Sequence, residues 1–332
     1  MWKLLGIINR NLIVAIPVMM LAGFAFGIKI NPAFLKAYIV PFTFLMVYPM
    51  MVTLKIKKVF EGGDAKAQLL TQSINFLIVP FMAAGLGYFF FRDQPYMALG
   101  LLLAGLVPTS GMTISWTGFA GGNLAAAVKM TVIGLTLGSL ATPFYVKWIM
   151  GAKINVDILS VMKQIAVIVF LPMVLGYFTR VGIISVTGEK RFADVWAKRF
   201  PGLSTIGVLG IVFIAIALKA RVIYASPQLL VYILMPLGIM YIFNFFISTV
   251  IGRVFLPKED AIALVYGSVM RNLSIALAIA LNTFGPEGSS AALVIAAAYI
   301  IQVQSAAWYV KFTDACFGSN KDKCTTAIAQ AG

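Results

Sequence analysis

The sequence has no histidine, only 11 acidic residues and only two cysteines among its 332 residues. Without histidine, the chain lacks the commonest metal ligand and the side chain that exchanges protons most readily near neutral pH. The two cysteines, Cys316 and Cys324, both lie close to the C-terminus, where they cannot form a disulfide framework or a metal site within the fold. These absences argue against an enzyme, a bound metal and a cofactor, and we expect none of the three.

Charged residues are also scarce, at 11% of the chain, while hydrophobic residues make up 61%. Soluble globular domains carry about 25% charged residues and about 45–50% apolar ones. This composition excludes a water-soluble enzyme and a disordered chain, and it predicts an all-α membrane protein embedded in the lipid bilayer. The 26 Lys and Arg residues give a net charge of +15. In so apolar a chain, this charge indicates basic loops at the cytoplasmic surface rather than a nucleic-acid partner.

Apolar stretches long enough to cross a bilayer occur ten times along the chain, since a helix needs about 20 apolar residues to cross the hydrocarbon layer. Lys and Arg are about twice as frequent in the connections on the side of the N-terminus as in those on the other side. By the positive-inside rule, this predicts a multi-pass protein of the cytoplasmic membrane with both termini in the cytoplasm. The ten predicted spans are residues 11–28, 35–54, 69–91, 96–119, 123–147, 158–179, 203–219, 228–251, 261–283 and 289–312.

The two halves of the chain share short motifs in the same order. Residues 1–152 and 153–316 each contain five of the predicted spans, and residues 317–332 are expected to form a cytoplasmic tail. Because five is an odd number, a duplicated unit must be inserted in opposite senses, as in the inverted repeats of many secondary transporters. The matched motifs are Ile16-Pro17 with Leu171-Pro172, Asn75-Phe-Leu-Ile with Asn244-Phe-Phe-Ile, and Pro108-Thr-Ser-Gly111 with Arg271-Asn-Leu-Ser274.

Two basic residues lie deepest inside the predicted spans, whereas all the acidic residues fall in predicted loops, tails or span ends. Arg271 is about ten residues into the ninth span, roughly 15 Å deep at 1.5 Å per residue. An arginine at this depth is costly, and it predicts either a fixed positive charge along a transport pathway or a side chain bound to helix-end carbonyls. Lys129 is only about six residues, roughly 9 Å, into the fifth span. It either snorkels to the interface or couples transport by releasing and rebinding a proton.

The fourth predicted span is interrupted by Pro108 and Gly111. Proline removes a helix hydrogen bond and glycine adds backbone freedom, and unwound backbone at membrane depth is tolerated where it lines a cavity or is covered by protein. We interpret the interruption as a discontinuous helix, at the same depth as Arg271, rather than as an ordinary proline kink. The residues predicted to bind a substrate there are Pro108, Thr109, Ser110, Thr113, Arg271, Asn272 and Ser274.

Three further polar residues lie in other spans: Gln72 and Asn75 in the third and Asn244 in the eighth. Such residues commonly form hydrogen bonds between membrane helices, and we regard them as secondary candidates for the site. In the fifth span, Gly134 and Gly138 are four positions apart, which predicts a surface for close helix packing.

Several segments of the chain are similar to segments found in a known family. They are Phe44-Leu-Met-Val-Tyr-Pro-Met in the second span, Pro108 to Trp116 followed by Gly121-Gly-Asn, and Arg271 to Ala280 followed by Phe284-Gly. With them, the chain resembles the bile acid:sodium symporter superfamily, and within it the arsenical-resistance (arsenite efflux) permease branch. The resemblance implies ten helices arranged as a panel domain and a core domain, with broken helices 4 and 9 crossing near the substrate. It also implies substrates such as bile salts, other organic anions or arsenite.

The chain departs from the family at positions that the resemblance marks as functional. The arsenite branch has a cysteine where this chain has Thr109 and a glutamate where it has Ser274. The sodium ligands of the family correspond to Ile114, Gly267 and Arg271, so they are largely missing and a positive charge replaces one of them. We therefore expect transport without sodium.

These observations predict a secondary transporter that moves a small anionic solute by alternating access. Arg271 would neutralise the solute, and helix N-termini at the break would add positive potential. An arsenite or antimonite efflux permease is one alternative, and a passive anion channel is another. The sequence leaves the direction of transport, the coupling ion and the oligomeric state open.

Overall fold

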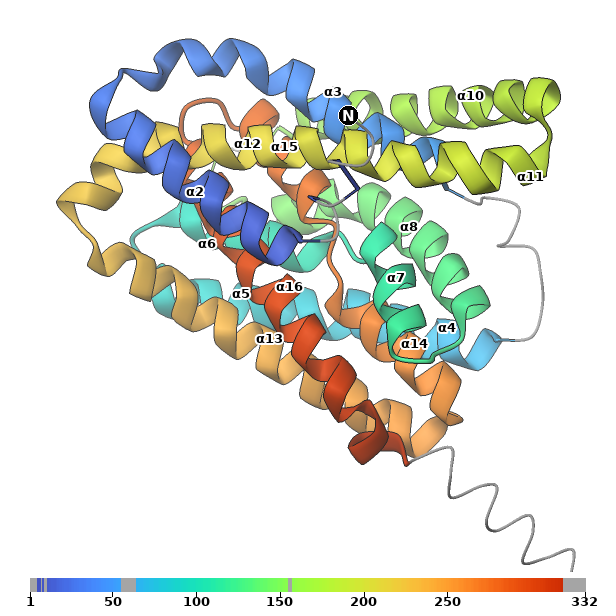
Figure 1. Ribbon diagram of the computed structural model, residues 1–332. Helices are drawn as coiled ribbons and strands as arrows, with labels where there is room; N and C mark the ends of the chain where they lie inside the picture. The colour runs from blue at the N-terminus through green and yellow to red at the C-terminus, as the bar shows by residue number, and fades with distance from the viewer. Residues whose placement is uncertain (1–4, 7, 9–10, 55–63, 155–156, 319–332) are drawn as a thin grey trace, which may run out of the picture.

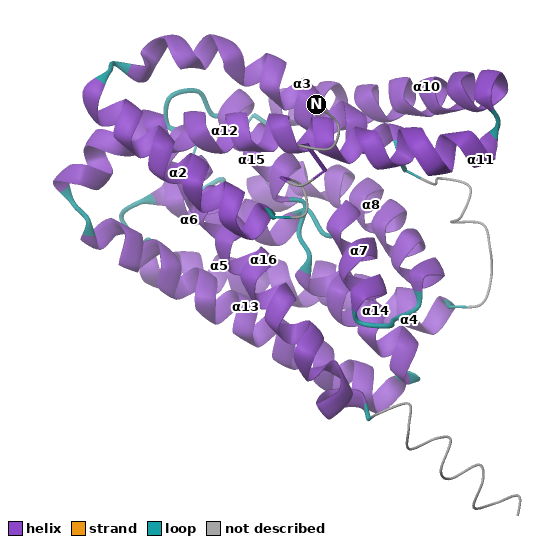
Figure 2. Cartoon of the chain, viewed as in Figure 1, coloured by secondary structure: helices purple, strands orange, loops and turns teal. Residues whose placement is uncertain are grey.

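The computed structural model describes residues 5, 6, 8, 11–54, 64–154 and 157–318. Within these ranges the chain is helical and contains no β-strand beyond one isolated bridge (Figure 2). The predicted all-α membrane fold is confirmed at this level. The tail expected at residues 317–332 lies almost wholly outside the described residues.

Among the described residues, seven helices are long and apolar enough to cross a membrane. The first four along the chain are Pro32–Val52 (η1, Pro32–Tyr38, and α3, Ile39–Val52), Ala65–Phe90 (α4, Ala65–Ser73; η3, Ile74–Ile78; α5, Val79–Phe90), Leu124–Met150 (α8) and Ile158–Thr187 (α9, Ile158–Ile165; η4, Ala166–Phe170; α10, Leu171–Thr187). The other three are Glu189–Ala225 (α11, Glu189–Arg191; η5, Phe192–Trp196; α12, Ala197–Ala225), Gln228–Phe255 (α13) and Gly288–Phe317 (α16).

The remaining three predicted spans are shorter helices or pairs of helices. The first is α2 (Leu12–Lys29), the fourth is α6 (Pro95–Leu106) with α7 (Gly111–Phe119), and the ninth is α14 (Lys258–Val269) with α15 (Leu273–Thr283). The fourth span is therefore a discontinuous helix, as predicted, and not one helix with a proline kink. The ninth span is interrupted in the same way at Arg271.

The turn between α7 and α8 shows how local chemistry fixes the position of a half-helix. Gly121 has a φ of 72°, a conformation that favours glycine. At Gly122 an added Cβ would lie 2.6 Å from Ile262 Cγ2, so the turn lies directly on α14. Asn123 Oδ1 accepts the N–H groups at the start of α8, and its Nδ2 donates to Asp260 Oδ1 at 2.7 Å. The turn thereby ties α7 and α8 to α14.

The helices pack in two groups (Figure 1). In the α12 group, α12 packs against α2 and α3, and α10 packs against α3. The α16 group comprises α4 to α8 and α13 to α16. In this group, α16 packs against α6, α13 and α15. Helix α14 packs against α13, α4 and α8. The two groups meet where α15 contacts α3 and where α16 contacts α2 and α12.

Candidate functional site

The two interrupted helices cross at their breaks, within the α16 group. Segments 107–109 and 270–272 lie antiparallel and are joined by two backbone hydrogen bonds, from Thr109 N to Met270 O (2.8 Å) and from Asn272 N to Val107 O (2.8 Å). These bonds satisfy backbone groups that the breaks would otherwise leave unpaired, which is why irregular backbone can be buried here. The structure thus brings together the two segments that the sequence predicts to form one site.

Thr109 has a backbone φ of 62°, the only positive φ of a non-glycine among the described residues. This left-handed conformation costs a residue with a Cβ about 1–2 kcal/mol. The hydroxyl of Thr109 lies 2.7 Å from the Pro108 carbonyl oxygen and 3.2 Å from that of Thr131 on α8. The Thr109 side chain is fully buried, and its hydroxyl therefore serves to hold the strained turn against α8.

Gly134 and Gly138 on α8 make room for this turn. An added Cβ on Gly134 would lie 2.8 Å from the Thr109 hydroxyl oxygen, and one on Gly138 would lie 2.5 Å from Pro108 Cδ. No side chain could occupy either position without displacing the turn. The predicted close-packing surface on the fifth span is confirmed, and its partner is the break in the fourth span.

Replacing Gly138 with alanine is expected to push the Pro108 ring away from α8 and to loosen the crossing. We expect a lower midpoint of thermal unfolding in detergent, because overpacking costs about 1–3 kcal/mol, and slower transport in proteoliposomes. Gly85→Ala is the matched control, since an added Cβ on Gly85 of α5 meets no heavy atom within 4 Å and alanine favours the helix. Equal stability of the two variants would contradict the packing role of Gly138.

The half-helices α7 and α15 both begin at the crossing, and side chains of the predicted site cap them. Ser110 Oγ accepts from the Met112 N–H (3.3 Å), and Thr113 Oγ1 accepts from the Ser110 N–H (3.1 Å), which together form a capping box. Asn272 Oδ1 accepts from the Ile275 N–H (3.2 Å). Two helix N-termini, each with partial positive charge, therefore meet at the crossing.

Arg271 is 1% exposed, and none of its three guanidinium nitrogens has a hydrogen-bond partner among the described residues. The alternative of a side chain bound to helix-end carbonyls is therefore not observed within those residues. The backbone of Arg271 is fixed instead: its N–H donates to Gln302 Oε1 (2.8 Å), and Gln302 Nε2 donates to its carbonyl oxygen (3.2 Å). A buried guanidinium without a partner is costly, which points to a negatively charged ligand at this place.

Sequence reasoning missed Gln302, Tyr241 and Tyr299, all of which are buried around the crossing. The Tyr241 hydroxyl donates to Gln302 Oε1 (2.9 Å), so α13 positions the glutamine that holds the Arg271 backbone. The hydroxyls of Ser274 and Tyr299 lie 2.6 Å apart, which turns the predicted Ser274 toward α16. Gln302 could have been found from the sequence, because a glutamine in the middle of an apolar span is unusual. The two tyrosines have no comparable feature in the sequence.

Asn75 and Asn244 hold the broken end of α14. Asn75 Nδ2 donates to the Gly267 carbonyl (3.0 Å), and Asn244 Nδ2 donates to the Ser268 carbonyl (2.9 Å). These carbonyls lie in the last turn of the helix, where no further turn supplies N–H groups. Both asparagines thus form interhelical hydrogen bonds, as expected. The side-chain amide of Gln72 is buried, and neither of its polar atoms has a partner in the described part of the chain.

Lys129 does not snorkel, because its side chain is only 4% exposed and its Nζ donates to Asp64 Oδ1 at 2.6 Å. Asp64 is itself 8% exposed at the side chain, and Gln68 Nε2 donates both to Asp64 Oδ2 (2.9 Å) and to the Ala126 carbonyl (3.0 Å). The sequence places Asp64 in a loop before the third span. In the structure Asp64 is the N-cap of α4, at the edge of the span Ala65–Phe90, and it is buried because this end of α4 lies against α8.

The crossing combines a buried guanidinium, two helix N-termini and an amide nitrogen of Asn272 that has no partner among the described residues. Within the same residues there is no group of three or more His, Cys, Asp or Glu side chains that could hold a metal ion. The arrangement is suited to binding a small anion, since the guanidinium of Arg271 and the amide nitrogen of Asn272 are both hydrogen-bond donors and the guanidinium is positively charged.

Comparisons with known proteins indicate membrane transport. The model of the Sodium Bile acid symporter family matches residues 40–226, a range that includes both halves of the interrupted fourth span. The chain is 25% identical over 284 residues to the arsenical-resistance protein Acr3 of Alkaliphilus metalliredigens, which covers 81% of this chain and 79% of that protein.

Two further relatives match most of the chain. The arsenical-resistance protein Acr3 of Corynebacterium glutamicum is 21% identical over 260 residues, covering 74% of this chain and 70% of that protein. The uncharacterized transporter slr0944 of Synechocystis is 26% identical over 287 residues, covering 78% of this chain and 73% of that protein. All three matches are long enough to include most of the helices described above.

Proposed function

Because the chain belongs to the sodium bile acid symporter family, we propose that it is a secondary transporter that moves a small anionic solute across the cytoplasmic membrane. The family and the relatives support membrane transport. One observation carries the choice of an anion: the guanidinium of Arg271 is buried at the crossing, and its three nitrogens have no partner among the described residues.

In this proposal, Arg271 neutralises the solute while the N-termini of α7 and α15 add positive potential. The Asn272 side chain accepts the N–H of Ile275 with its oxygen, which leaves its amide nitrogen to donate to the solute. The hydroxyls of Thr109 and Thr113 already have structural partners. We therefore assign the two threonines to shaping the site and the guanidinium and amide to binding.

We further propose that transport does not require sodium. At Gly267, where the family resemblance places a sodium ligand, an added Cβ would lie 2.7 Å from Met130 Sδ and 3.0 Å from Thr71 Cγ2. A longer side chain has no room there without repacking. Arg271 stands at a second such position and would supply the positive charge that a bound sodium ion supplies elsewhere in the family.

The two packing groups supply the moving parts of an alternating-access mechanism. We identify the α12 group with the panel domain of the family and the α16 group with the core domain, and residues 1–152 and 153–316 with two inverted repeats. Each group contains helices from both halves of the chain, as intertwined repeats require. Since the crossing belongs to the α16 group, rocking this group against the α12 group would carry Arg271 between the two sides of the membrane.

Lys129 is our candidate for coupling, with Asp64 as its partner. The pair is buried at the same helix that contacts the broken fourth span, because the Thr109 hydroxyl contacts the carbonyl of Thr131, two residues beyond Lys129 in α8.

Counterflow in proteoliposomes tests this function. Purified protein is reconstituted, and the exchange of labelled for unlabelled pyruvate, succinate, taurocholate and arsenite is measured in sodium-free and sodium-containing buffers. A carrier concentrates label transiently under these conditions, whereas an open anion channel does not. We expect counterflow of at least one organic anion, with the same rate when potassium replaces sodium. Uptake without counterflow would favour the channel, and a sodium requirement would overturn the proposed independence from sodium.

An arsenite or antimonite efflux permease is the second candidate, which two relatives named as arsenical-resistance proteins favour. By the family resemblance, Thr109 stands where that branch has a cysteine, and Cys316 lies at the far end of α16, in its last turn. Arsenite would therefore have to bind to hydroxyl and amide groups. Counterflow of arsenite alone among the four solutes would decide for this alternative.

A further inference from the structure

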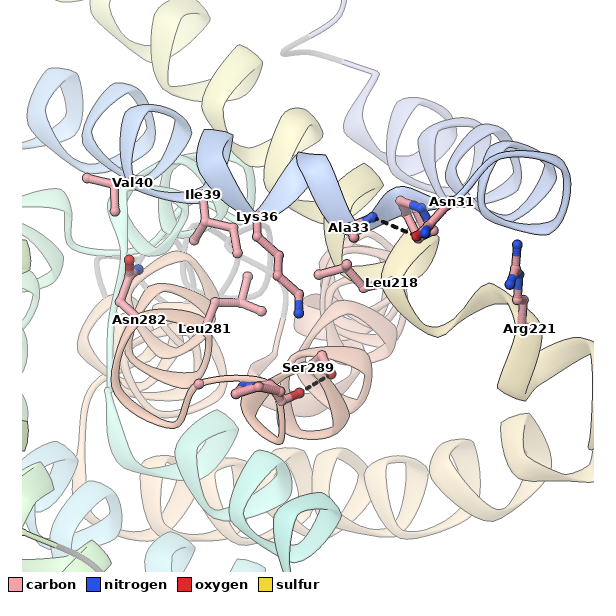
Figure 3. A pocket seen from close by; sticks show the side chains of 14 residues that line it. Asn31, Ala33, Lys36, Ile39, Val40, Leu218, Arg221, Leu281, Asn282 and Ser289 are labelled. Carbon is pink, nitrogen blue, oxygen red and sulfur yellow. Dashed lines mark hydrogen bonds between the residues drawn. The ribbon is translucent and has the colours of Figure 1, made fainter.

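A second positively charged site lies away from the crossing, in a cavity of about 590 Å³ between the two packing groups (Figure 3). The connections α2–η1 and α15–α16 and the last turns of α12 surround it, at the end of the molecule that the positive-inside rule assigns to the exterior. Its volume is within the range of about 300–1,000 Å³ that is usual for small-molecule sites. The residues that the argument uses are Asn31, Lys36, Arg221, Asn282 and Ser289.

The charge of this cavity is of one sign. Its lining contains Lys36 from η1 and Arg221 from α12, and no acidic side chain. Figure 3 shows the Lys36 side chain extending into the cavity toward Ser289. Glu287 lies in the adjoining turn and interacts electrostatically with Lys219 of α12. Neither residue belongs to the lining of the cavity.

Two polar residues and a helix end also belong to the lining of this cavity. Ser289 lies in the first turn of α16, whose N-terminus carries partial positive charge. Asn282, near the end of α15, has a side-chain amide that donates to the Ala278 carbonyl (2.8 Å) and to Thr43 Oγ1 on α3 (3.3 Å). Its contact with Thr43 joins the two packing groups, so a ligand in the cavity touches both groups where they would separate during transport.

The cavity and the crossing lie at opposite ends of one helix. α15 begins beside Arg271, and Leu281 and Asn282 near its other end line the cavity. An 11-residue helix is about 16 Å long, so the two positive sites are close in space and distinct. The lining also contains apolar side chains, such as Val40 and Leu218, which are suited to contact the carbon skeleton of an organic anion.

We propose that this cavity is an outer anion site, where a small carboxylate- or sulfonate-bearing solute binds to Lys36 and Arg221 before it reaches Arg271. The order of the two sites rests on the proposed function, whereas binding in the cavity does not. Lys36 and Arg221 raise the local concentration of anions at the mouth of the pathway and exclude cations from it.

Cysteine modification with reagents of opposite charge tests the site without knowledge of the natural solute. Ser289→Cys is made in a protein that also carries Cys316→Ser and Cys324→Ser. The rates of modification by anionic sulfonatoethyl methanethiosulfonate and cationic trimethylammonioethyl methanethiosulfonate are then compared. We expect the anionic reagent to react faster, and Lys36→Gln with Arg221→Gln to lower the ratio of the two rates at least about tenfold.

The matched control removes Arg92 and Lys163 as glutamines, since both are exposed cations outside the lining. It is expected to leave the ratio of rates unchanged. Protection of the thiol by succinate, and not by the zwitterion betaine, would add direct support for a bound carboxylate. Slow reaction with both reagents, or a ratio insensitive to Lys36 and Arg221, would overturn the site.

The same variants separate this inference from the proposed function. Arg271→Gln is expected to abolish transport and to leave the charge selectivity at Ser289→Cys intact. If Arg271→Gln spared transport while the selectivity persisted, the central site would be wrong and the outer site would stand. If Lys36→Gln with Arg221→Gln left the half-saturating solute concentration for transport unchanged, the outer site would have no place before Arg271.

Discussion

Replacing Arg271 with glutamine is expected to reduce anion counterflow at least about 100-fold, or about 2.8 kcal/mol at about 1.4 kcal/mol per factor of ten. The solute would lose its counter-charge in a site of low dielectric, together with charge-assisted hydrogen bonds from the guanidinium. Removing one partner of a buried charge pair typically costs about 2–5 kcal/mol. Glutamine keeps a polar side chain at the position, so the charge is the main property that changes.

The thermal stability of the Arg271→Gln variant distinguishes a role in binding from a structural role. Because the guanidinium of Arg271 has no hydrogen-bond partner among the described residues, neutralising it removes a desolvation cost from the substrate-free protein. The midpoint of thermal unfolding without solute is therefore expected to stay the same or to rise. Transport lost together with stability would make Arg271 a structural residue, and unchanged transport would contradict its role toward an anion.

Two further variants act as controls for this result. Arg271→Lys keeps the charge but not the planar fork of donors, so part of the transport should remain. Gln302→Leu removes both contacts to the Arg271 backbone, at 2.8 and 3.2 Å, without changing the charge of the site. We expect it to lower thermal stability and to affect transport less than Arg271→Gln does.

The break in the fourth span and the buried arginine of the ninth could be predicted from the residues because their signals are local, whereas the crossing was implied by the family resemblance. Pro108 removes a helix hydrogen bond in an apolar span, and Arg271 lies too deep in another span to reach water easily. Each signal depends on a few neighbouring residues and on the thickness of the bilayer. The break in the fourth span and the depth of Arg271 were therefore accessible without knowledge of how the helices pack.

The remaining polar partners depend on contacts between distant segments. Asp64 and Lys129 are 65 positions apart, and Arg271 and Gln302 are 31 apart. Hydrophobic patterning locates spans but contains no information on which helix faces which. Asp64 consequently reads as a loop residue in the sequence, although α8 covers it in the structure.

Local chemistry was also ambiguous at Ser110 and Thr113. Hydroxyls beside a break in a membrane helix are suitable for binding a solute, and the same spacing of three residues is that of a capping box. Only the geometry decides between them: the two side chains cap the first turn of α7. Their contribution to an anion site is then the orientation of the helix N-terminus rather than the hydroxyl groups themselves.

Replacing Asp64 with asparagine is expected to destabilise the protein strongly, because it leaves the ammonium group of Lys129 without its carboxylate. The pair is 2.6 Å apart, with side chains 4% and 8% exposed. Breaking a buried ion pair by removing one partner costs about 3–5 kcal/mol. The measurement is the midpoint of thermal unfolding in detergent, which should fall well below that of the unmodified protein.

A second ion pair in the same chain serves as the matched control. Lys258 and Asp314 are 2.7 Å apart, and although the Lys258 side chain is only 10% exposed, that of Asp314 is 73% exposed, so water screens the carboxylate. Asp314→Asn should therefore cost no more than about 1 kcal/mol, as for other solvent-exposed pairs. Equal losses of stability in the two variants would mean that burial of the Asp64–Lys129 pair has no energetic consequence.

The double variant Asp64→Leu with Lys129→Met separates stability from coupling. Replacing a buried ion pair by apolar side chains is often neutral or stabilising by about 1–4 kcal/mol, so we expect normal thermal stability. Counterflow should persist, since Arg271 and the crossing are unchanged. Accumulation of solute driven by an imposed pH gradient should disappear, because no titratable group remains at the pair. Accumulation equal to that of the unmodified protein would show that the pair only holds α4 to α8, and coupling would then have to lie elsewhere in the molecule.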